Sequence, residues 1–322
     1  QKRRTQVTTE AAEMTLEDLI AKEEVVISLS SGGYVKRIPV STYTAQGRGG
    51  KGITGADVKE EDFIEHFFVT DTHATLLFFT TRGRTFALKA YEIPEGNRTS
   101  RGKALVNLLA LGGEEKITST IAIRSFEETK GKETYLVMCT RNGTIKKTPL
   151  ADFENIRRSG IIAISLDEGD VLVEVQHTSG SDEILIATKV GMSIRFKESD
   201  VRSMGRTAAG VRGIRLDKDD QVIGMEAFPA DSKKSLLTVC EHGHGKRTAL
   251  SEYRGQGRGG GGVITIKATD RNGAVIGVKL VTNEDDFMIM TEQGKTIRMR
   301  CKDIKTISRN TQGVRLVNLE EG

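Results

Sequence analysis

The amino-acid sequence predicts an all-β, propeller-like fold of six four-stranded blades. Two observations lead to this prediction. A unit of roughly 50 residues recurs along the 322 residues of the chain, and such a period is typical of solenoids and propellers. Within each unit two glycines recur at a fixed distance of 19 residues, or 17 in the third unit. Six copies with so constant a spacing indicate one repeated structural element.

Each unit begins with a short apolar run, rich in β-branched and aromatic residues, that leads to a first glycine, the turn glycine. A second run follows at once, for example Thr144-Ile145-Lys146-Lys147. Two β-favouring runs separated by a glycine turn predict a β-hairpin. The six apolar runs with their turn glycines are 25–29 with Gly33, 75–79 with Gly83, 135–139 with Gly143, 184–188 with Gly191, 236–240 with Gly243 and 287–291 with Gly294.

The second glycine of each unit, the loop glycine, closes a polar loop and precedes a third strand, as at residues 160–166. An acidic turn and a fourth strand follow, as at residues 167–173. Four strands per unit predict six blades within residues 24–322, beginning near residues 24, 74, 133, 182, 234 and 285. Residues 1–23 lack the repeat and are predicted to be a linker with a short helical turn that docks on the first blade. The loop glycines are Gly52, Gly102, Gly160, Gly210, Gly262 and Gly313.

Composition narrows the class of protein. With 35 glycines and only four prolines, the chain is suited to many tight β-turns rather than to disorder. The three cysteines Cys139, Cys240 and Cys301 form no CxxC pair, which favours buried thiols over a redox role and fits a reducing cytoplasm. No apolar stretch approaches the roughly 18 residues of a membrane-spanning helix, and no signal peptide is expected.

Charge is distributed in phase with the repeat. The net charge is only +4, from 48 basic and 44 acidic residues. Residues 189–215 nevertheless contain seven basic and two acidic side chains, whereas residues 165–183 contain six acidic and no basic ones. Equivalent positions of successive blades lie on one circle, so the basic segments should form a continuous belt, with the acidic turns on another surface. Such a belt indicates a nucleic-acid partner; solvated loops would not explain charge in phase with most repeats.

One loop motif occurs twice. The heptapeptide Gln46-Gly47-Arg48-Gly49-Gly50-Lys51-Gly52 recurs 210 residues later as Gln256-Gly257-Arg258-Gly259-Gly260-Gly261-Gly262. Consecutive glycines allow backbone N–H groups to approach a phosphate closely, and arginine can bind a phosphate through two hydrogen bonds. Because no recognition helix is expected, the sequence predicts phosphate-driven, sequence-tolerant binding that depends on DNA bendability.

Several motifs are typical of enzymes, but the residues around them exclude that interpretation. The stretch Gly255–Gly260 matches GxGxxG, but a strand at 263–266 follows it where a dinucleotide fold has a helix. The tripeptide Gly245-Lys246-Arg247 lacks the Ser or Thr of a P-loop, and His242 and His244 lack a third metal ligand nearby. We therefore expect no catalytic residue and no metal site in this chain.

The chain resembles the C-terminal domain of DNA gyrase A subunits, which are parts of bacterial type IIA topoisomerases. The resemblance covers essentially the whole sequence. It is carried by the heptapeptide at 46–52, Tyr34-Val35-Lys36, Ile93-Pro94-Glu95, Gly143-Thr144-Ile145-Lys146-Lys147, Val211-Arg212-Gly213-Ile214-Arg215-Leu216, Gly245-Lys246-Arg247-Thr248-Ala249 and Asn310-Thr311-Gln312-Gly313-Val314.

The resemblance implies a six-bladed β-pinwheel in which neighbouring blades exchange strands. It implies that about one gyre of double-stranded DNA wraps around a basic rim with positive handedness. The catalytic tyrosine would lie in the preceding part of the A subunit, and ATP hydrolysis would belong to the B subunit of an A2B2 holoenzyme. No cofactor is therefore expected in this domain, since ATP and magnesium act elsewhere, and the location would be cytoplasmic at the nucleoid, without a membrane partner.

One departure is Gly47, where the family usually has a basic residue. The alternatives are the equivalent domain of topoisomerase IV, which usually has fewer blades and a degraded heptapeptide, and a propeller that serves as a protein scaffold or enzyme without DNA. The residues predicted to bind DNA are Gln46, Gly47, Arg48, Gly49, Gly50, Lys51, Gly52, Arg98, Arg101, Lys103, Lys146, Lys147, Arg157, Arg158, Arg195, Arg206, Arg212, Lys246, Arg247, Arg258, Arg298 and Arg309.

Overall fold

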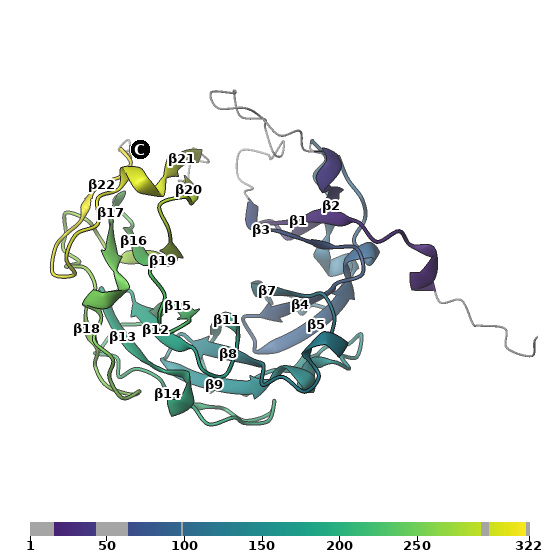
Figure 1. Ribbon diagram of the computed structural model, residues 1–322, viewed down its shortest axis with the longest axis horizontal. Coiled ribbons are helices and arrows are strands. Elements are labelled where there is room, and N and C mark those ends of the chain that lie inside the picture. Colours follow the sequence, from purple (N-terminus) through teal and green to yellow (C-terminus); the bar gives the residue numbers. More distant parts are fainter. Residues whose placement is uncertain (1–15, 43–63, 98, 291–295, 320–322) are drawn as a thin grey trace, which may run out of the picture.

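Each repeat folds into antiparallel strands around a glycine turn, and the repeats follow one another around a common centre (Figure 1). The structure, a computed structural model, describes residues 16–42, 64–97, 99–290 and 296–319. In these ranges every helix is a 3-10 turn. The chain is therefore all-β and propeller-like with four-stranded blades, as predicted.

The strands fall into four classes by their place in a repeat. The first hairpin strands are β1 (Glu24–Ser30), β4 (Thr75–Thr80), β8 (Tyr135–Thr140), β12 (Glu183–Thr188), β16 (Ser235–Cys240) and β20 (Asp286–Met290). The second hairpin strands are β2 (Tyr34–Pro39), β5 (Arg84–Lys89), β9 (Thr144–Pro149), β13 (Met192–Lys197), β17 (His244–Ala249) and β21 (Thr296–Arg300). The inner strands are β3 (Ile64–Asp71), β7 (Ile117–Ile123), β11 (Leu172–Thr178), β15 (Val222–Phe228) and β19 (Val275–Val281). The outer strands have two residues each and are β6 (Lys103–Ala104), β10 (Ile161–Ile162), β14 (Val211–Arg212), β18 (Val263–Ile264) and β22 (Val314–Arg315).

Short 3-10 turns connect these strands. Six of them directly follow a second hairpin strand: η2 (Val40–Thr42), η3 (Ala90–Glu92), η6 (Leu150–Phe153), η7 (Glu198–Asp200), η8 (Leu250–Glu252) and η9 (Cys301–Asp303). The others are η1 (Leu16–Leu19), η4 (Leu105–Asn107) and η5 (Glu127–Thr129).

The outer strand of each complete blade comes from the following repeat. The sheet orders are β3-β1-β2-β6, β7-β4-β5-β10, β11-β8-β9-β14, β15-β12-β13-β18 and β19-β16-β17-β22. In the third blade, for example, Val211 and Arg212 of the fourth repeat pair with Ile145 and Thr144 of β9. Figure 1 shows the inner strands near the centre of the ring and β14, β18 and β22 on its outside. Backbone hydrogen bonds thus join each blade to its neighbour.

The described residues complete five of the six predicted four-stranded blades. The sixth repeat contributes the hairpin β20–β21, which is a two-stranded sheet, and the strand β22, which belongs to the fifth blade. The prediction of six four-stranded blades is therefore met in five blades by the ranges that the structure describes.

The two recurring glycines hold the outer strand against the preceding blade. Gly210 has a φ of +106°, and a Cβ atom on it would lie 2.6 Å from the carbonyl oxygen of Ile145. Gly262 has a φ of +75°, and its Cβ would lie 2.2 Å from the carbonyl oxygen of Ser193. Ile145 and Ser193 each stand two residues after a turn glycine. Only glycine fits so close an approach, which explains why a glycine recurs at this place in the repeats.

Apolar side chains from neighbouring blades form the core. Phe79 of β4 and Phe153 of the next repeat, for example, pack edge to face with their ring centres 5.9 Å apart. Cys139, Cys240 and Cys301 are buried and free, which confirms the prediction of buried thiols. Burial raises the pKa of Cys240 to about 11, so this thiol stays protonated at neutral pH.

The turn η1 contacts the beginning of the second repeat. Thr72 Oγ1 donates to the carbonyl oxygen of Ala21 at 2.8 Å, and Lys89 Nζ lies 3.0 Å from Glu17 Oε1. The predicted docking on the first blade is therefore corrected: the described part of this segment lies against residues at the β3–β4 turn and on β5. No helix in the described ranges is long and apolar enough to cross a membrane.

Candidate nucleic-acid interface

In the second to sixth repeats a polar loop follows the second hairpin strand and its 3-10 turn, and it lies along the outer edge of the preceding blade. The backbone of Ser203 forms a parallel bridge with Lys147, and Gly255 forms the equivalent bridge with Arg195. We call the loops that end at a loop glycine the rim loops; those with described residues are 94–102, 154–160, 202–210, 254–262 and 305–313. They place equivalent residues at the outside of successive blades.

Exposed cations recur on the rim loops and on the outer strands that follow them. The guanidinium of Arg101 lies 3.7 Å from the centre of the Tyr34 ring, which holds this cation at the surface of the first blade. The predicted DNA-binding residues that the structure leaves exposed on this belt are Arg101, Lys103, Arg157, Arg158, Arg212 and Arg258.

An arginine stands four residues before the loop glycine in four of these loops, and the structure describes it in three of them. Arg258 Nη1 donates to the carbonyl oxygen of Arg212 at 3.1 Å, and Arg309 Nη1 donates to the carbonyl oxygen of Ile264 at 2.8 Å. Both acceptors stand two residues after the preceding loop glycine. Arg206 is the third member and, like Arg309, it is half-buried. Arg258 and Arg309 therefore lie beside the outer strand of the repeat before their own.

A second group of predicted DNA-binding residues lies inside the protein, and this corrects the prediction for them. Lys146 and Lys246 are 0% exposed, Arg247 is 5% exposed and Lys147 is 7% exposed. A side chain so deeply buried offers no surface to a phosphate. The sequence did not reveal this, because adjacent basic residues are mostly exposed, whereas both members of Lys146-Lys147 and of Lys246-Arg247 are buried here.

The buried cations have internal partners. Arg247 donates from Nε to Ser235 Oγ at 2.9 Å and from Nη1 to the carbonyl oxygen of Cys301 at 2.6 Å. Lys147 Nζ lies 3.9 Å from Glu198 Oε1 and 4.8 Å from the centre of the Tyr135 ring. These contacts assign Arg247 and Lys147 to the packing between neighbouring repeats.

Two further predicted residues are engaged by carboxylates. Arg195 is half-buried, forms an ion pair with Glu183 and donates to the carbonyl oxygen of Leu250 at 2.8 Å. Arg298 is exposed, but its Nε lies 2.8 Å from Asp286 Oδ2. Arg195 is therefore largely withdrawn from the surface, whereas Arg298 stays exposed beside its carboxylate partner.

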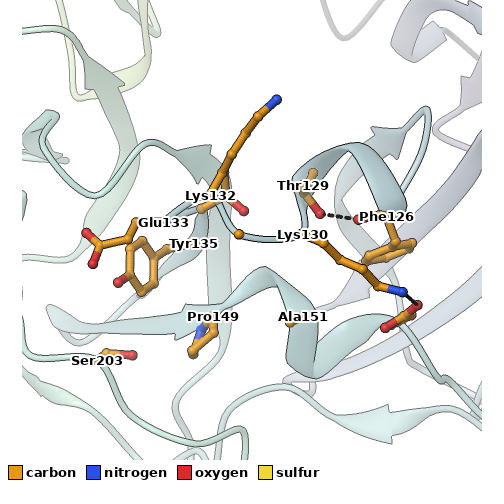
Figure 2. Close-up of a pocket in the computed structure, with 12 residues that line it drawn as sticks. Phe126, Thr129, Lys130, Lys132, Glu133, Tyr135, Pro149, Ala151 and Ser203 are labelled. Carbon is orange, nitrogen blue, oxygen red and sulfur yellow. Dashed lines mark hydrogen bonds and ion pairs between the residues drawn. The ribbon is translucent and has the colours of Figure 1, made fainter.

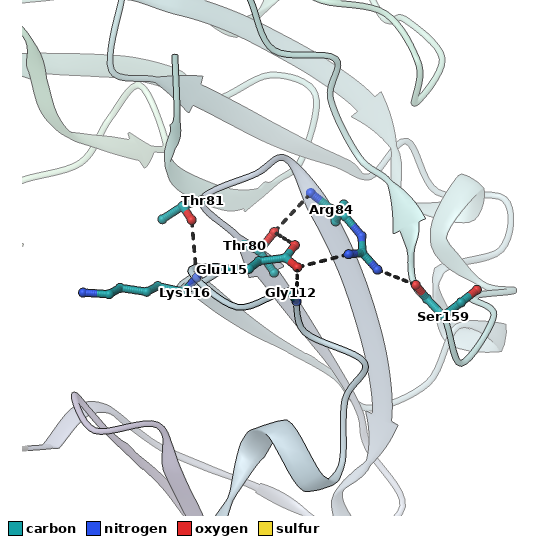
Figure 3. A network of polar contacts seen from close by, with 7 residues as sticks. All are labelled: Thr80, Thr81, Arg84, Gly112, Glu115, Lys116 and Ser159. Carbon is teal, nitrogen blue, oxygen red and sulfur yellow. Dashed lines mark hydrogen bonds and ion pairs between the residues drawn. The ribbon is translucent and has the colours of Figure 1, made fainter. Parts of the chain in front are cut away.

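A buried carboxylate supports the rim loop of the third repeat (Figure 3). Glu115 accepts from Thr80 Oγ1 at 2.6 Å and from Arg84 Nη1 at 3.1 Å. The same guanidinium reaches the carbonyl oxygen of Ser159 through Nη2 at 2.6 Å. Ser159 directly follows Arg157 and Arg158, so the network fixes the loop that carries both of these exposed cations.

The heptapeptide Gln46–Gly52 and Arg98 lie outside the described residues, so their predicted role stays a prediction. The second copy at 256–262 is described and is held by its backbone. Gly259 N donates to the carbonyl oxygen of Gly213 at 2.6 Å, and Arg215 N donates to that of Gly260 at 2.9 Å. Glycines in this motif therefore also serve to pack the loop against the preceding repeat.

On the described rim loops, three exposed cations were missed by the prediction. They share one position, eight residues before the loop glycine, and they are Arg202, Arg254 and Lys305. Aligning the repeats on the loop glycine, rather than searching for the heptapeptide, would have identified all three.

A pocket between the second and third repeats shows no catalytic arrangement (Figure 2). Phe126, Tyr135 and Pro149 line it together with Lys130, whose Nζ is paired with Glu127 and lies 3.8 Å from Glu154 Oε1. In the part of the chain that the structure describes, no three His, Cys, Asp or Glu side chains are grouped so as to hold a metal ion.

Comparison with known proteins agrees with this geometry. The family described as DNA gyrase C-terminal domain, beta-propeller, matches residues 24–71, 74–124, 134–179, 182–229, 234–282 and 285–322. The DNA gyrase A subunit of Salmonella typhimurium is 46% identical over 319 residues, which cover 99% of this chain and 36% of that protein. The gyrase A subunit of Escherichia coli K12 is 46% identical over 320 residues, with the same coverage. The chain thus spans about a third of the length of these relatives.

Two solved structures have the same fold. A C-terminal domain of DNA topoisomerase IV gives a TM-score of 0.77 at 26% identity and covers 93% of this chain and 90% of that one. A DNA gyrase A C-terminal domain gives a TM-score of 0.74 at 25% identity and covers 92% of this chain and 96% of that one. The match of all six repeats and the sequence similarity over 99% of this chain show that it belongs to the family of DNA gyrase C-terminal β-propeller domains.

Proposed function

We propose that this domain is a non-catalytic DNA-wrapping module of a type IIA topoisomerase and that double-stranded DNA follows its rim. The observation that carries the proposal is the recurrence of exposed cations on the rim loops and outer strands of successive repeats. Arg202, Arg254 and Lys305 share one position, eight residues before the loop glycine, and further exposed cations are Arg101, Arg158, Arg212 and Arg258. Cations that neutralise phosphates release counterions and supply sequence-independent affinity. A belt that runs around the ring therefore favours DNA that curves with it.

Wrapping requires strong bending. The persistence length of DNA is about 50 nm, so curvature around one small domain costs several kcal/mol, which contacts on successive blades would offset. We expect affinity to depend on fragment length, because a fragment of about 15 base pairs spans fewer blades than one of about 40 base pairs. Equal affinities for the two would indicate one local site.

The finer features follow from the same proposal. We infer that the sixth repeat completes a sixth blade and that the loop Gln46–Gly52 adds cations to the rim. In the complete enzyme, DNA cleavage would belong to the preceding part of the A subunit, and ATP hydrolysis with magnesium to the B subunit of an A2B2 assembly. The role of this domain would be to present wrapped DNA so that strand passage introduces negative supercoils.

A topology assay tests the proposal. Relaxed plasmid is incubated with the chain and a nicking-closing enzyme, and the plasmid is deproteinised and separated by gel electrophoresis. Positive wrapping predicts trapped positive supercoils that increase with protein concentration. The triple substitution Arg157→Ala, Arg158→Ala and Arg212→Ala should reduce this shift strongly. The matched control is Lys218→Ala, which removes an exposed cation from an acidic turn and should leave the shift unchanged. Topology that does not change with the unsubstituted chain would contradict wrapping.

The alternative is the corresponding domain of topoisomerase IV, because a solved C-terminal domain of that enzyme matches this fold with a TM-score of 0.77. The 46% identity to gyrase A subunits favours gyrase. Reconstitution of the full A subunit with its B subunit separates the two, because gyrase supercoils relaxed plasmid with ATP. An enzyme that relaxes and decatenates but never supercoils would support topoisomerase IV.

A further inference from the structure

The residue three positions after the turn glycine alternates in character around the chain. It is lysine in the first, third and fifth repeats and apolar in the second, fourth and sixth. The six residues in order are Lys36, Phe86, Lys146, Ile194, Lys246 and Ile297. An alternation with a period of two repeats is superimposed on the sixfold repeat.

The three lysines enter the rim loop of the following repeat. Lys146 Nζ donates to the carbonyl oxygen of Ala163 at 2.6 Å and also to that of Arg206. Lys36 Nζ donates to the carbonyl oxygen of Ser100 at 2.7 Å and to that of Asn97 at 3.2 Å. In the second and fourth repeats, one lysine ammonium group of the preceding repeat thus donates hydrogen bonds to the backbone of the rim loop.

The fifth blade repeats the arrangement. Lys246 Nζ donates to the carbonyl oxygen of Ser308 at 2.8 Å, to Thr311 Oγ1 at 3.1 Å and to the carbonyl oxygen of Arg309. An ammonium has three donors and no acceptor, and here the loop supplies acceptors for all three. Lys146 and Lys246 each bind the carbonyl of the arginine that lies four residues before the loop glycine.

Burial makes this coupling strong. Lys146 and Lys246 are 0% exposed, and a buried cation without acceptors is costly. Burial lowers the pKa of Lys146 to about 8, with a further contribution from the nearby Arg206 guanidinium. The pKa of Lys246 is lowered to about 8 by burial and by Arg309. Displacing the loop would remove all three acceptors of the Lys246 ammonium and would leave Lys146 with the carbonyl of Ala163 alone, so each lysine is energetically coupled to its loop.

We infer that Lys36, Lys146 and Lys246 are positioning residues: each fixes the rim loop of the next repeat and so sets where the cations of that loop face the DNA. In the sixth repeat, Lys246 holds the backbone of Arg309, while the carbonyl oxygen of Ile264 holds its side chain. Both ends of that arginine are therefore set by the protein. The effect on DNA rests on the proposed function, whereas the effect on the loop does not.

The other rim loops are held differently. The loop of the third repeat lies over Phe86 and is reached by Arg84 through Ser159. The loop of the fifth repeat lies over Ile194 and is held by backbone contacts, including Gln256 N to the carbonyl oxygen of Arg195 at 2.8 Å. We call the lysine-bound loops of the second, fourth and sixth repeats the pinned loops. This difference supplies a matched control within the same chain.

A double-mutant cycle on the folded chain tests the inference. The variants are Lys146→Met, Arg206→Ala and the two combined, and the matched control is Ile194→Met. Affinity for a DNA fragment of about 40 base pairs is measured against salt concentration, and amide hydrogen exchange at residues 205–209 is measured without DNA. Arg206→Ala should weaken binding about 5- to 10-fold at moderate salt and reduce the salt slope by about 0.9.

If Lys146 acts through the loop, Lys146→Met weakens binding by a similar factor, and the double variant loses at most about twofold more than the worse single variant. Exchange at 205–209 rises in Lys146→Met and stays unchanged in Ile194→Met. Losses that multiply in the double variant would overturn the inference, because Lys146 would then act independently of Arg206. Unchanged exchange at 205–209 would overturn it whatever happens to DNA binding.

A failure of the proposed function gives a different result. If the unsubstituted chain does not bind DNA, wrapping fails, while exchange protection that depends on Lys146 still supports the positioning of the loop. Should Lys146→Met not fold, the same cycle with Lys246→Met, Arg309→Ala and exchange at residues 308–312 decides the question.

Discussion

The rim loops of the fourth and fifth repeats hold an arginine at the same place by different means. In the fourth repeat the backbone carbonyl of Arg206 accepts from the buried ammonium of Lys146. In the fifth, the residue under the loop is Ile194, and the loop around Arg258 is made almost entirely of glycine. Its contacts to the preceding repeat include backbone hydrogen bonds, such as Gly259 N to the carbonyl oxygen of Gly213, and the bonds that the Arg258 side chain donates to the carbonyl oxygens of Asp200 and Arg212. The comparison shows that a lysine in a basic run can be buried and can hold the backbone of a rim loop, rather than offer its own charge at the surface.

The largest effect, on the free energy of unfolding, is expected from a substitution that prevents the fifth-repeat loop from packing closely against the preceding blade. Gly262→Ala would place a Cβ 2.2 Å from the carbonyl oxygen of Ser193 at a φ of +75°. We expect a loss of about 2–4 kcal/mol in the free energy of unfolding, measured by urea denaturation. The control is Gly257→Ala, since a Cβ there meets nothing within 4 Å; this change should stay within about 1 kcal/mol. Equal losses in both variants would show that the close contact does not decide stability.

The two copies of the heptapeptide give a second, intermediate test. Arg48→Ala with Lys51→Ala removes two cations from the first copy, and binding should weaken by at most about 1–3 kcal/mol. In the reconstituted holoenzyme, negative supercoiling should be lost while relaxation and decatenation continue, because cleavage occurs outside this domain.

The control for the heptapeptide is Arg258→Ala in the second copy. That copy has Gly261 where the first has Lys51, so the substitution should affect supercoiling less. Normal supercoiling by the Arg48→Ala and Lys51→Ala variant, or an equal defect with Arg258→Ala, would show that the first copy has no role beyond that of any other rim loop.

The smallest expected effect is a pH dependence of the free energy of unfolding, which comes from the buried lysines that bind the pinned loops. The pKa of Lys146 and of Lys246 is about 8 in the folded chain, against an ordinary value of 10.5. Between these values the unfolded chain retains protons that the folded chain has released. The two lysines therefore make the free energy of unfolding rise as the pH increases from about 8 towards 10.5, and this contribution is lost as the pH falls through 8.

Lys146→Met should reduce this rise by on the order of 1 kcal/mol between pH 7.5 and 9.5, measured by urea denaturation at both pH values. Ile194→Met should keep the rise of the unsubstituted chain. A Lys146→Met variant with the full rise would show that this ammonium carries no desolvation cost in the folded chain.

The sequence predicted the regular parts of the fold and the presence of exposed cations on the loops outside the blades. Hairpins were predictable because apolar runs end at turn glycines such as Gly143, which has a φ of +85°. The outer strands have only two residues, too few for a periodic pattern, so their exchange between repeats followed only from the family resemblance. The burial of Lys146 and Lys147 was not predictable because lysines are mostly exposed, and only the three-dimensional path of the next rim loop shows what covers them.

The salt dependence of DNA binding tests the central claim most directly. Affinity of the 322-residue chain for a fragment of about 40 base pairs is measured between 50 and 200 mM salt. If cations on successive rim loops neutralise about six to ten phosphates, affinity should fall by about 10³- to 10⁵-fold across this range. A shallow dependence that corresponds to about two phosphate contacts would contradict a continuous belt and would leave only a local binding site.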